Sequence, residues 1–175
     1  LRSGKIDYCS WEASGSPKTV LNLRSEADSV EWRNSKFLHC PKANDFEMYN
    51  TKSKEARLWL QSVFKCIASL SDLKVDDSFP LLIHCFAGRD RTGIVCAMLQ
   101  IMLETPMSEV FSSFDVNPRN EQDQERRARF VEALDGLRPT TADWKKMECD
   151  QDSNPFGQPP LQHYLRKEVD VRKIQ

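Results

Sequence analysis

The spacing of hydrophobic residues divides the first half of the chain into short strands and one long helix. Short runs of β-branched and apolar residues at Lys18–Arg24 and Phe37–Cys40 predict strands. Between residues 51 and 70 the apolar positions recur every three or four residues, which is the period of an amphipathic helix, and Thr51 or Ser53 can serve as its N-cap. We expect the apolar face of this helix to pack on a sheet.

A third strand and a buried helix follow one another closely in the middle of the chain. Phe79–Cys85 is a short apolar run after a polar turn, as is typical of a central strand that is covered on both faces. Thr92–Glu104 is apolar almost all round and ends before Pro106, so it predicts a buried helix. The sequence therefore predicts a strand, a loop and a helix in direct succession.

The last third of the chain is predicted to be helical. Helices are expected at Ser108–Phe114, Pro118–Leu137, Thr141–Cys149 and Leu161–Lys167. In the second of these only the later turns carry apolar residues, so we interpret its polar first half, "RNEQDQERR", as a solvated face. The predicted fold class is α/β: a single domain over residues 1–175 with a mostly parallel central sheet flanked by helices and a helical C-terminal part.

Composition narrows the range of functions. The 175 residues carry a formal net charge of −1, which gives no general attraction to nucleic acid or to an anionic membrane. The longest nearly apolar run, Ile94–Leu103, is too short for a membrane span. Six cysteines without close pairing and three distant histidines indicate a reducing, cytoplasmic setting without a metal site, and we expect no cofactor.

Candidate chemistry is concentrated in residues 84–93, "HCFAGRDRTG", between the apolar strand and the buried helix. Backbone N–H groups of such a loop can converge above the helix N-terminus, where the helix dipole favours an anion. Gly88 lets the backbone turn inward, and the Arg91 guanidinium can hold two phosphate oxygens at once. A thiol at the position of Cys85, near a helix N-terminus and a cation, ionises readily and becomes a nucleophile. The residues therefore indicate phosphoryl transfer to cysteine.

The same ten residues resemble the His-Cys-x5-Arg-Thr-Gly signature loop of the cysteine-dependent protein tyrosine and dual-specificity phosphatase superfamily. The segments "LRSGKID" and "TVLNLRSEAD" are similar to segments of a tyrosine phosphatase branch found in bacteria, fungi, plants and protists, and "HYLRKEVDV" is a weaker match. The pattern Cys-x-x-Gly-x-Asp-Arg-Thr-Gly is similar to that of atypical lipid and tyrosine phosphatases. The resemblance implies a fold like that of the dual-specificity phosphatases.

The resemblance also implies a two-step hydrolysis of phosphomonoesters. Cys85 would attack phosphorus, Arg91 and the loop amides would hold the equatorial oxygens, and water would then release phosphate. Thr92 could donate its hydroxyl to the sulfur. The expected substrate-binding residues are those of the loop: Phe86, Ala87, Gly88, Arg89, Asp90, Arg91 and Thr92.

Two aspartates are candidates for the general acid that protonates the leaving oxygen. Asp90 lies within the loop, where the aspartate of the similar atypical phosphatases is thought to act, and it is slightly favoured. Asp45 follows the second predicted strand, where many dual-specificity phosphatases carry their acid. The alternative role for Asp90 is an ion pair with Arg89 or another basic side chain, and for Asp45 that of an ordinary exposed carboxylate.

The substrate class stays open at this point. Arg89 adds a second cation at the rim of the loop, which favours an inositol phosphate or phosphoinositide, but a phosphorylated protein is also compatible. We expect a monomer that acts on a phosphorylated protein, lipid or inositol phosphate. The alternative function is a catalytically silent phosphate-binding module. A further hypothesis is that Cys40 traps oxidised Cys85 as a disulfide.

Overall fold

The computed structural model describes residues 1–43, 46–72, 75–114 and 121–137 of the chain. Asp45 lies outside the described residues. So do the predicted helices Thr141–Cys149 and Leu161–Lys167 and the first three residues of the predicted helix Pro118–Leu137.

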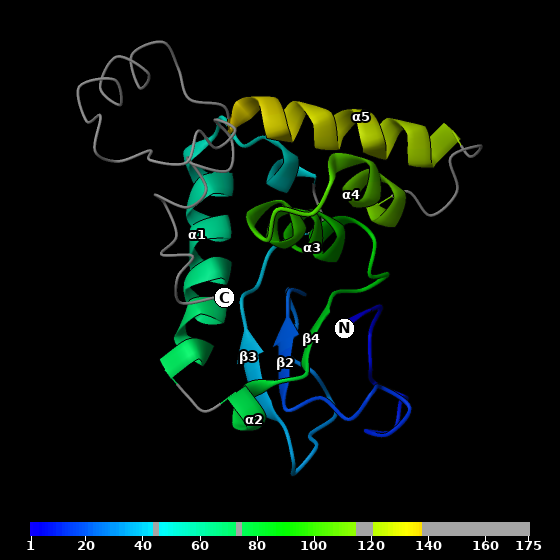
Figure 1. Ribbon diagram of the computed structural model, residues 1–175. Coiled ribbons are helices and arrows are strands. Elements are labelled where there is room, and N and C mark those ends of the chain that lie inside the picture. Colours follow the sequence, from blue (N-terminus) through cyan, green and yellow to red (C-terminus); the bar gives the residue numbers. More distant parts are fainter. Residues whose placement is uncertain (44–45, 73–74, 115–120, 138–175) are drawn as a thin grey trace, which may run out of the picture.

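Four short strands form one sheet in the order β1-β4-β2-β3 (Figure 1). The three predicted strands are present: β2 (Thr19–Asn22) and β4 (Leu81–His84) are shorter than predicted, and β3 (Lys36–His39) is shifted by one residue toward the N-terminus. The two-residue strand β1 (Arg2–Ser3) has no apolar pattern that could predict it, and it pairs with β4 at the edge of the sheet. All the described pairings are parallel and β4 has a neighbour on each side, so the predicted parallel sheet is confirmed.

The helices predicted within the described residues are also confirmed, with ends that differ by up to three residues. Ser53, one of the two predicted N-caps, caps the long helix by accepting a hydrogen bond from the Ala56 N–H at 3.1 Å. The buried helix begins at Asp90, two residues before the predicted start, so Asp90 belongs to its first turn. The helices are α1 (Lys54–Ala68), α2 (Val75–Ser78), α3 (Asp90–Met102), α4 (Met107–Phe114) and α5 (Glu121–Gly136), with short 3-10 helices η1 (Glu47–Tyr49) and η2 (Ser69–Asp72).

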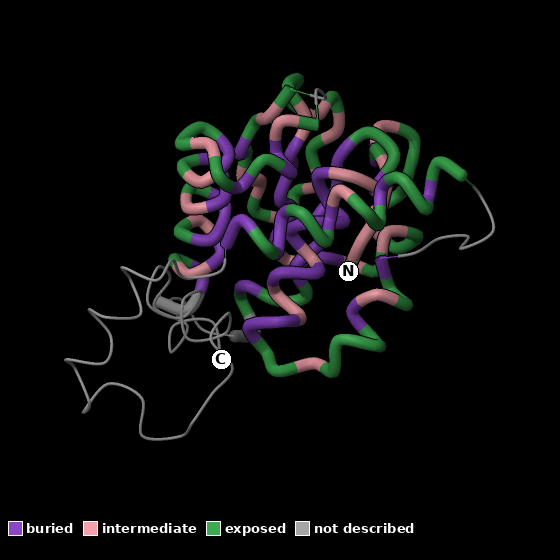
Figure 2. The backbone as a smooth tube through the Cα atoms, turned by 90° about the horizontal axis from the view of Figure 1, so that it is seen from above, coloured by how far each residue is buried: buried purple, intermediate pink, exposed green. Residues whose placement is uncertain are grey.

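The two faces of the sheet are covered differently. On one face Leu21 and Ile83 join a large core with buried side chains from α1, α3, α4 and α5. On the other face Val20 and Leu82 pack with Ile6 in a small cluster, to which the described helices contribute no residue. Figure 2 shows the buried stretches gathered along the inner sides of the helices, with exposed stretches on the outer turns. Within the described part of the chain, no helix is both long and apolar enough to cross a membrane.

Two residues in the polar first half of α5 are buried, so its interpretation as a solvated face is wrong at Asp123 and Arg126, whereas their described neighbours in residues 121–127 are exposed. Asp123 and Arg126 are only 3% and 4% exposed. They lie three residues apart, and with Phe130 and Ala133 they form one continuous helix face that turns toward the core. The buried polar pair is tolerated because the two side chains form an ion pair with each other and bond to other parts of the fold.

Candidate active site

The signature loop has a buried base and an exposed rim. Cys85, the first residue after β4, is 2% exposed, and Arg91 in the first turn of α3 is 4% exposed. Phe86, by contrast, is 61% exposed. A thiol and a guanidinium from the two ends of the loop thus lie within the fold, where water competes weakly for their interactions.

The N-terminal segment fixes the loop from outside. The Arg2 Nε donates to the Gly88 carbonyl at 2.9 Å, and the Lys5 N–H donates to the Phe86 carbonyl at 2.9 Å. Gly88 has a φ of +68°, and a Cβ added there would lie 2.5 Å from the Ser3 carbonyl oxygen. The expected need for glycine at this turn is therefore confirmed, and the closeness of Ser3 is a second reason for it.

These two carbonyl contacts also determine which way the loop amides point. In a trans peptide the N–H points opposite to the C=O of the same peptide group. Because the Phe86 and Gly88 carbonyls point toward the N-terminal segment, the Ala87 and Arg89 N–H groups point to the opposite side of the loop. Two amide donors are thereby oriented in the same sense, as an anion cradle requires.

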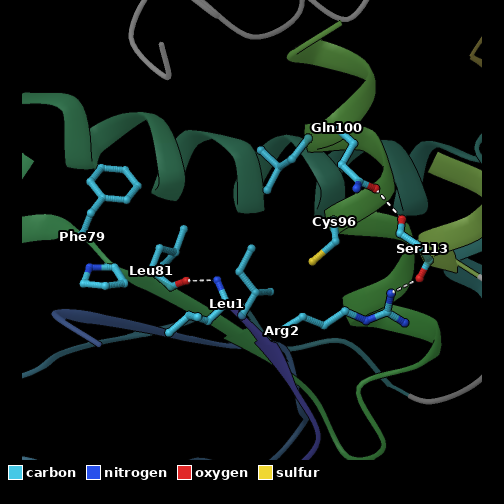
Figure 3. A pocket seen from close by; sticks show the side chains of 10 residues that line it. Leu1, Arg2, Phe79, Leu81, Cys96, Gln100 and Ser113 are labelled. Atoms are coloured by element: carbon cyan, nitrogen blue, oxygen red, sulfur yellow. Dashed lines mark hydrogen bonds between the residues drawn. The ribbon is translucent and has the colours of Figure 1, made fainter. Parts of the chain in front are cut away.

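Arg2 connects the loop to the end of α4. Its Nη1 donates to the Ser113 carbonyl at 2.9 Å, and Figure 3 shows the side chain extending from β1 toward Ser113. The side chain borders a cavity of about 620 Å³ whose described lining comes from β1, β4, α3 and their neighbours rather than from the signature loop. Beside it, a Cβ at Gly93 would lie 3.1 Å from the Phe114 ring, so the start of α3 packs closely against the end of α4.

In the guanidinium of Arg91, Nη1 is held by hydrogen bonds and Nε has no partner among the described residues. Its Nη1 donates to the carbonyls of Lys42 at 2.8 Å and Leu23 at 3.3 Å. Its Nε is buried and has no hydrogen-bond partner among the described residues, and the same holds for the hydroxyl of Thr92. A buried donor without a partner costs about 1–3 kcal/mol, so these two groups are suited to an anion above the start of α3.

His84 is held by a carboxylate in the network behind the loop. Its Nε2 lies 3.1 Å from Asp28 Oδ2, and the ring is fully buried. Arg24, from the "LRSEAD" segment, lies 3.7 Å from Asp28 and 2.9 Å from Asp7. Burial alone would raise the pKa of Asp7, but hydrogen bonds from Ser29 and the nearby Arg24 outweigh it and lower that pKa below its usual value. The resembling segments thus form an ion-pair network that supports the end of β4.

Of the two candidate acids, Asp90 is held by a hydrogen bond from the Tyr49 hydroxyl at 3.1 Å. Burial raises the pKa of Tyr49, and the charge of Asp90 raises it further, so the hydroxyl stays protonated and remains a donor. Asp45 is outside the described residues. On either side of it, Lys42 contacts Arg91 and Tyr49 contacts Asp90.

Arg89 has a buried partner that sequence reasoning missed. Its Nη2 lies 2.6 Å from Asp123 Oδ1, and Arg126 Nη1 lies 3.0 Å from the same oxygen. Arg126 also donates to the carbonyl of Phe114 and stacks over the ring of that residue. Within the described residues the ion pair considered for Arg89 and Asp90 is not formed, because Arg89 turns to α5 instead. The sequence did contain a signal for this burial: Asp123 and Arg126 lie on the same face of the helix as the apolar residues Phe130 and Ala133.

Cys40 has a neighbour other than the one proposed from the sequence. Its Sγ lies 3.2 Å from Cys66 Sγ, and burial, with a further contribution from Cys66, raises the pKa of the Cys40 thiol to about 12. The contact gives no support to a Cys40–Cys85 disulfide. No group of three or more His, Cys, Asp or Glu side chains within residues 1–43, 46–72, 75–114 and 121–137 is arranged to hold a metal ion.

Comparisons with known proteins identify the family. No curated protein sequence matches the chain significantly. One similar solved structure is the crystal structure of DUSP15, with a TM-score of 0.45 and 10% sequence identity; the match covers 90% of this chain and 92% of that chain. Another is OH1 from the Orf virus, described as a tyrosine phosphatase with distinct structural features and triple substrate specificity. It has a TM-score of 0.39 and 18% sequence identity, and the match covers 98% of this chain and 81% of that chain. The sequence model described as "Tyrosine phosphatase family" matches residues 13–171. Because this match spans most of the chain, the protein belongs to the tyrosine phosphatase family.

Proposed function

We propose that the protein is a phosphatase that hydrolyses phosphomonoesters through a cysteinyl-phosphate intermediate. The observation that carries the proposal is the meeting, in one loop, of the buried Cys85 thiol with the unpartnered donors of Arg91 and Thr92. Family membership is the independent support.

In the first step the Cys85 sulfur attacks phosphorus, so that an S–P bond forms and the bond to the leaving oxygen breaks. The guanidinium of Arg91 and the N–H groups of the loop hold the equatorial oxygens, where negative charge develops. In the second step water attacks the phosphocysteine, the S–P bond breaks and phosphate is released. The Thr92 hydroxyl then donates to the departing thiolate.

We propose Asp90 as the general acid, with Asp45 as the alternative. The Tyr49 hydrogen bond gives Asp90 a fixed orientation in the first turn of α3, beside the phosphate cradle. For Asp45 the support is its position in the chain, between two residues that contact Arg91 and Asp90. A general acid is worth about 10²–10⁴-fold in rate, and mainly when the leaving group is poor.

For the substrate we propose phosphotyrosine-type proteins, phosphoinositides or inositol phosphates. The exposed ring of Phe86 and the Lys5 ammonium, 5.6 Å from the centre of that ring, form an aromatic and cationic rim. The Arg89 side chain is 37% exposed, so it can also be reached by a ligand. Because the described cysteines are all free thiols, we propose that the protein acts in the reducing cytoplasm.

The proposed function is tested by phosphate release from p-nitrophenyl phosphate, a phosphotyrosine peptide, a phosphoinositide and an inositol polyphosphate. We expect the wild type to turn over substrate and Cys85→Ser to lose this activity. Cys9→Ser, which changes an exposed cysteine, is the control and should keep it. Binding of phosphate without any turnover would instead establish the catalytically silent module.

The acid is identified by comparing a poor leaving group with a good one. Asp90→Asn is expected to slow hydrolysis of phenyl phosphate far more than that of p-nitrophenyl phosphate, because the better leaving group needs little protonation. If only Asp45→Asn has this selective effect, the roles of the two aspartates are exchanged. If neither substitution has it, both assignments are wrong.

A further inference from the structure

The two arginines of the signature loop differ in how much of their charge is available to a ligand. Arg91 donates to the carbonyls of Lys42 and Leu23, and among the described residues no carboxylate lies within ion-pair distance of it. Arg89 lies 2.6 Å from a carboxylate oxygen of Asp123. The charge of the first arginine is therefore undiminished, whereas the charge of the second is partly offset by a carboxylate that it shares with Arg126.

Asp123 is fixed in place by the fold. Its side chain is 4% exposed, and its Oδ1 also accepts from Arg126 at 3.0 Å. Arg126 is itself held by the carbonyl of Phe114 and lies 4.9 Å above the centre of the Phe114 ring. Because this carboxylate cannot swing out into water, a phosphate that approaches Arg89 must compete with it for the guanidinium.

We propose that Asp123 is a specificity-determining residue that limits the charge Arg89 offers to a second phosphate group, so that the protein favours singly phosphorylated substrates. The inference rests on the proposed phosphatase activity. It reverses the expectation that Arg89 is a free cation for inositol polyphosphates. Asp123 acts through Arg89 and need not touch the substrate.

The test is the ratio of two kcat/KM values, for inositol hexakisphosphate and for a phosphotyrosine peptide, in the wild type and in Asp123→Asn. The substitution keeps the shape of the side chain and removes its charge. We expect the ratio to rise about two- to fivefold, the effect of losing one partly screened ion pair. A change in fold stability alone would lower both kcat/KM values together and leave their ratio unchanged.

Glu121→Gln is the matched control. Glu121 is exposed and lies two residues before Asp123 on α5, and replacing it with glutamine changes the net charge by the same amount as Asp123→Asn. We expect it to leave the ratio unchanged, and an equal rise in both variants would mean that net charge, not the Arg89 contact, is responsible. Adding Asp123→Asn to Arg89→Ala is expected to have no further effect on the ratio.

Arg89→Ala alone provides a second test, which does not require that the Asp123 variant folds. If the charge of Arg89 is already offset, its removal from the wild type should change the ratio less than about twofold. A tenfold fall, or an unchanged ratio in folded Asp123→Asn, would overturn the inference. Absence of turnover of both probes by the wild type would instead contradict the proposed function.

Discussion

Replacing Gly88 with alanine would place a methyl group against the backbone of the N-terminal segment. The added carbon would lie 2.5 Å from the carbonyl oxygen of Ser3 and 2.8 Å from the nitrogen of Gly4. Both are backbone atoms of the segment that pairs with β4 and donates to the loop, so neither can move aside alone. The residue would also have to keep a φ of +68°, which disfavours any side chain.

The expected cost has two parts. The left-handed conformation costs about 1–2 kcal/mol for a residue with a Cβ. Forcing an additional carbon into a closely packed place costs about 1–3 kcal/mol. The sum, about 2–5 kcal/mol, is enough to separate the loop from the N-terminal segment. Since the Ala87 and Arg89 amides are oriented by that contact, a shift of about 1 Å should lower kcat/KM on the order of 100-fold.

The assay pairs urea unfolding with kcat/KM on p-nitrophenyl phosphate, and Gly15→Ala is the matched control. Gly15 also has a positive φ, +85°, but the nearest atom to an added Cβ is in the side chain of Leu1, which can rotate away. This variant should lose only about 1–2 kcal/mol and keep its activity. If Gly88→Ala matches Gly15→Ala in both measurements, the contact between loop and N-terminal segment does not shape the cradle.

Three further predictions concern the surroundings of the loop. Tyr49→Phe removes a donor from Asp90 and should lower kcat for phenyl phosphate about two- to tenfold, with p-nitrophenyl phosphate as the reference; equal losses on both would contradict this role. Asp7→Asn should lower the urea midpoint at pH 7, and the difference from wild type should shrink below pH 3.8, because a depressed pKa contributes stability only while the carboxylate is ionised. Peroxide should oxidise Cys66, the more exposed thiol of its pair with Cys40, to a sulfenic acid, which the Cys40 sulfur attacks with loss of water, slowly because burial raises the pKa of Cys40; peptide mapping should find that disulfide, and a crosslink of Cys40 to another cysteine would refute it.

The strand, loop and helix around Cys85 could be predicted because each leaves a local pattern in the sequence. The apolar run, the glycines and the phosphate-binding residue types all lie within one short segment. The amphipathic α1 was equally readable, since its period extends over four turns and Ser53 caps it. The order of the strands, in contrast, depends on contacts between distant segments and was not predicted.

The parts that were missed are held by polar contacts between segments far apart in the chain. β1 has two polar residues, and its place beside β4 is determined by backbone pairing rather than by hydrophobicity. Asp123 and Arg126 were read as solvated because charged residues usually are. Their burial follows from pairing with each other and with Arg89, which a hydrophobic pattern cannot register.

The hydrogen bonds and the ion pair that hold the loop have a consequence for the order in which the protein folds. Arg2 and Gly88 are 86 residues apart in the chain, Arg91 and Lys42 are 49 apart, and Arg89 and Asp123 are 34 apart. We expect contacts of such high sequence separation to form late in folding, because the loops they close cost entropy before the contacts are made. We therefore expect the loop arrangement to be absent from partly folded chains, so that an oxyanion bound there would stabilise only the complete fold and link ligand occupancy to folding.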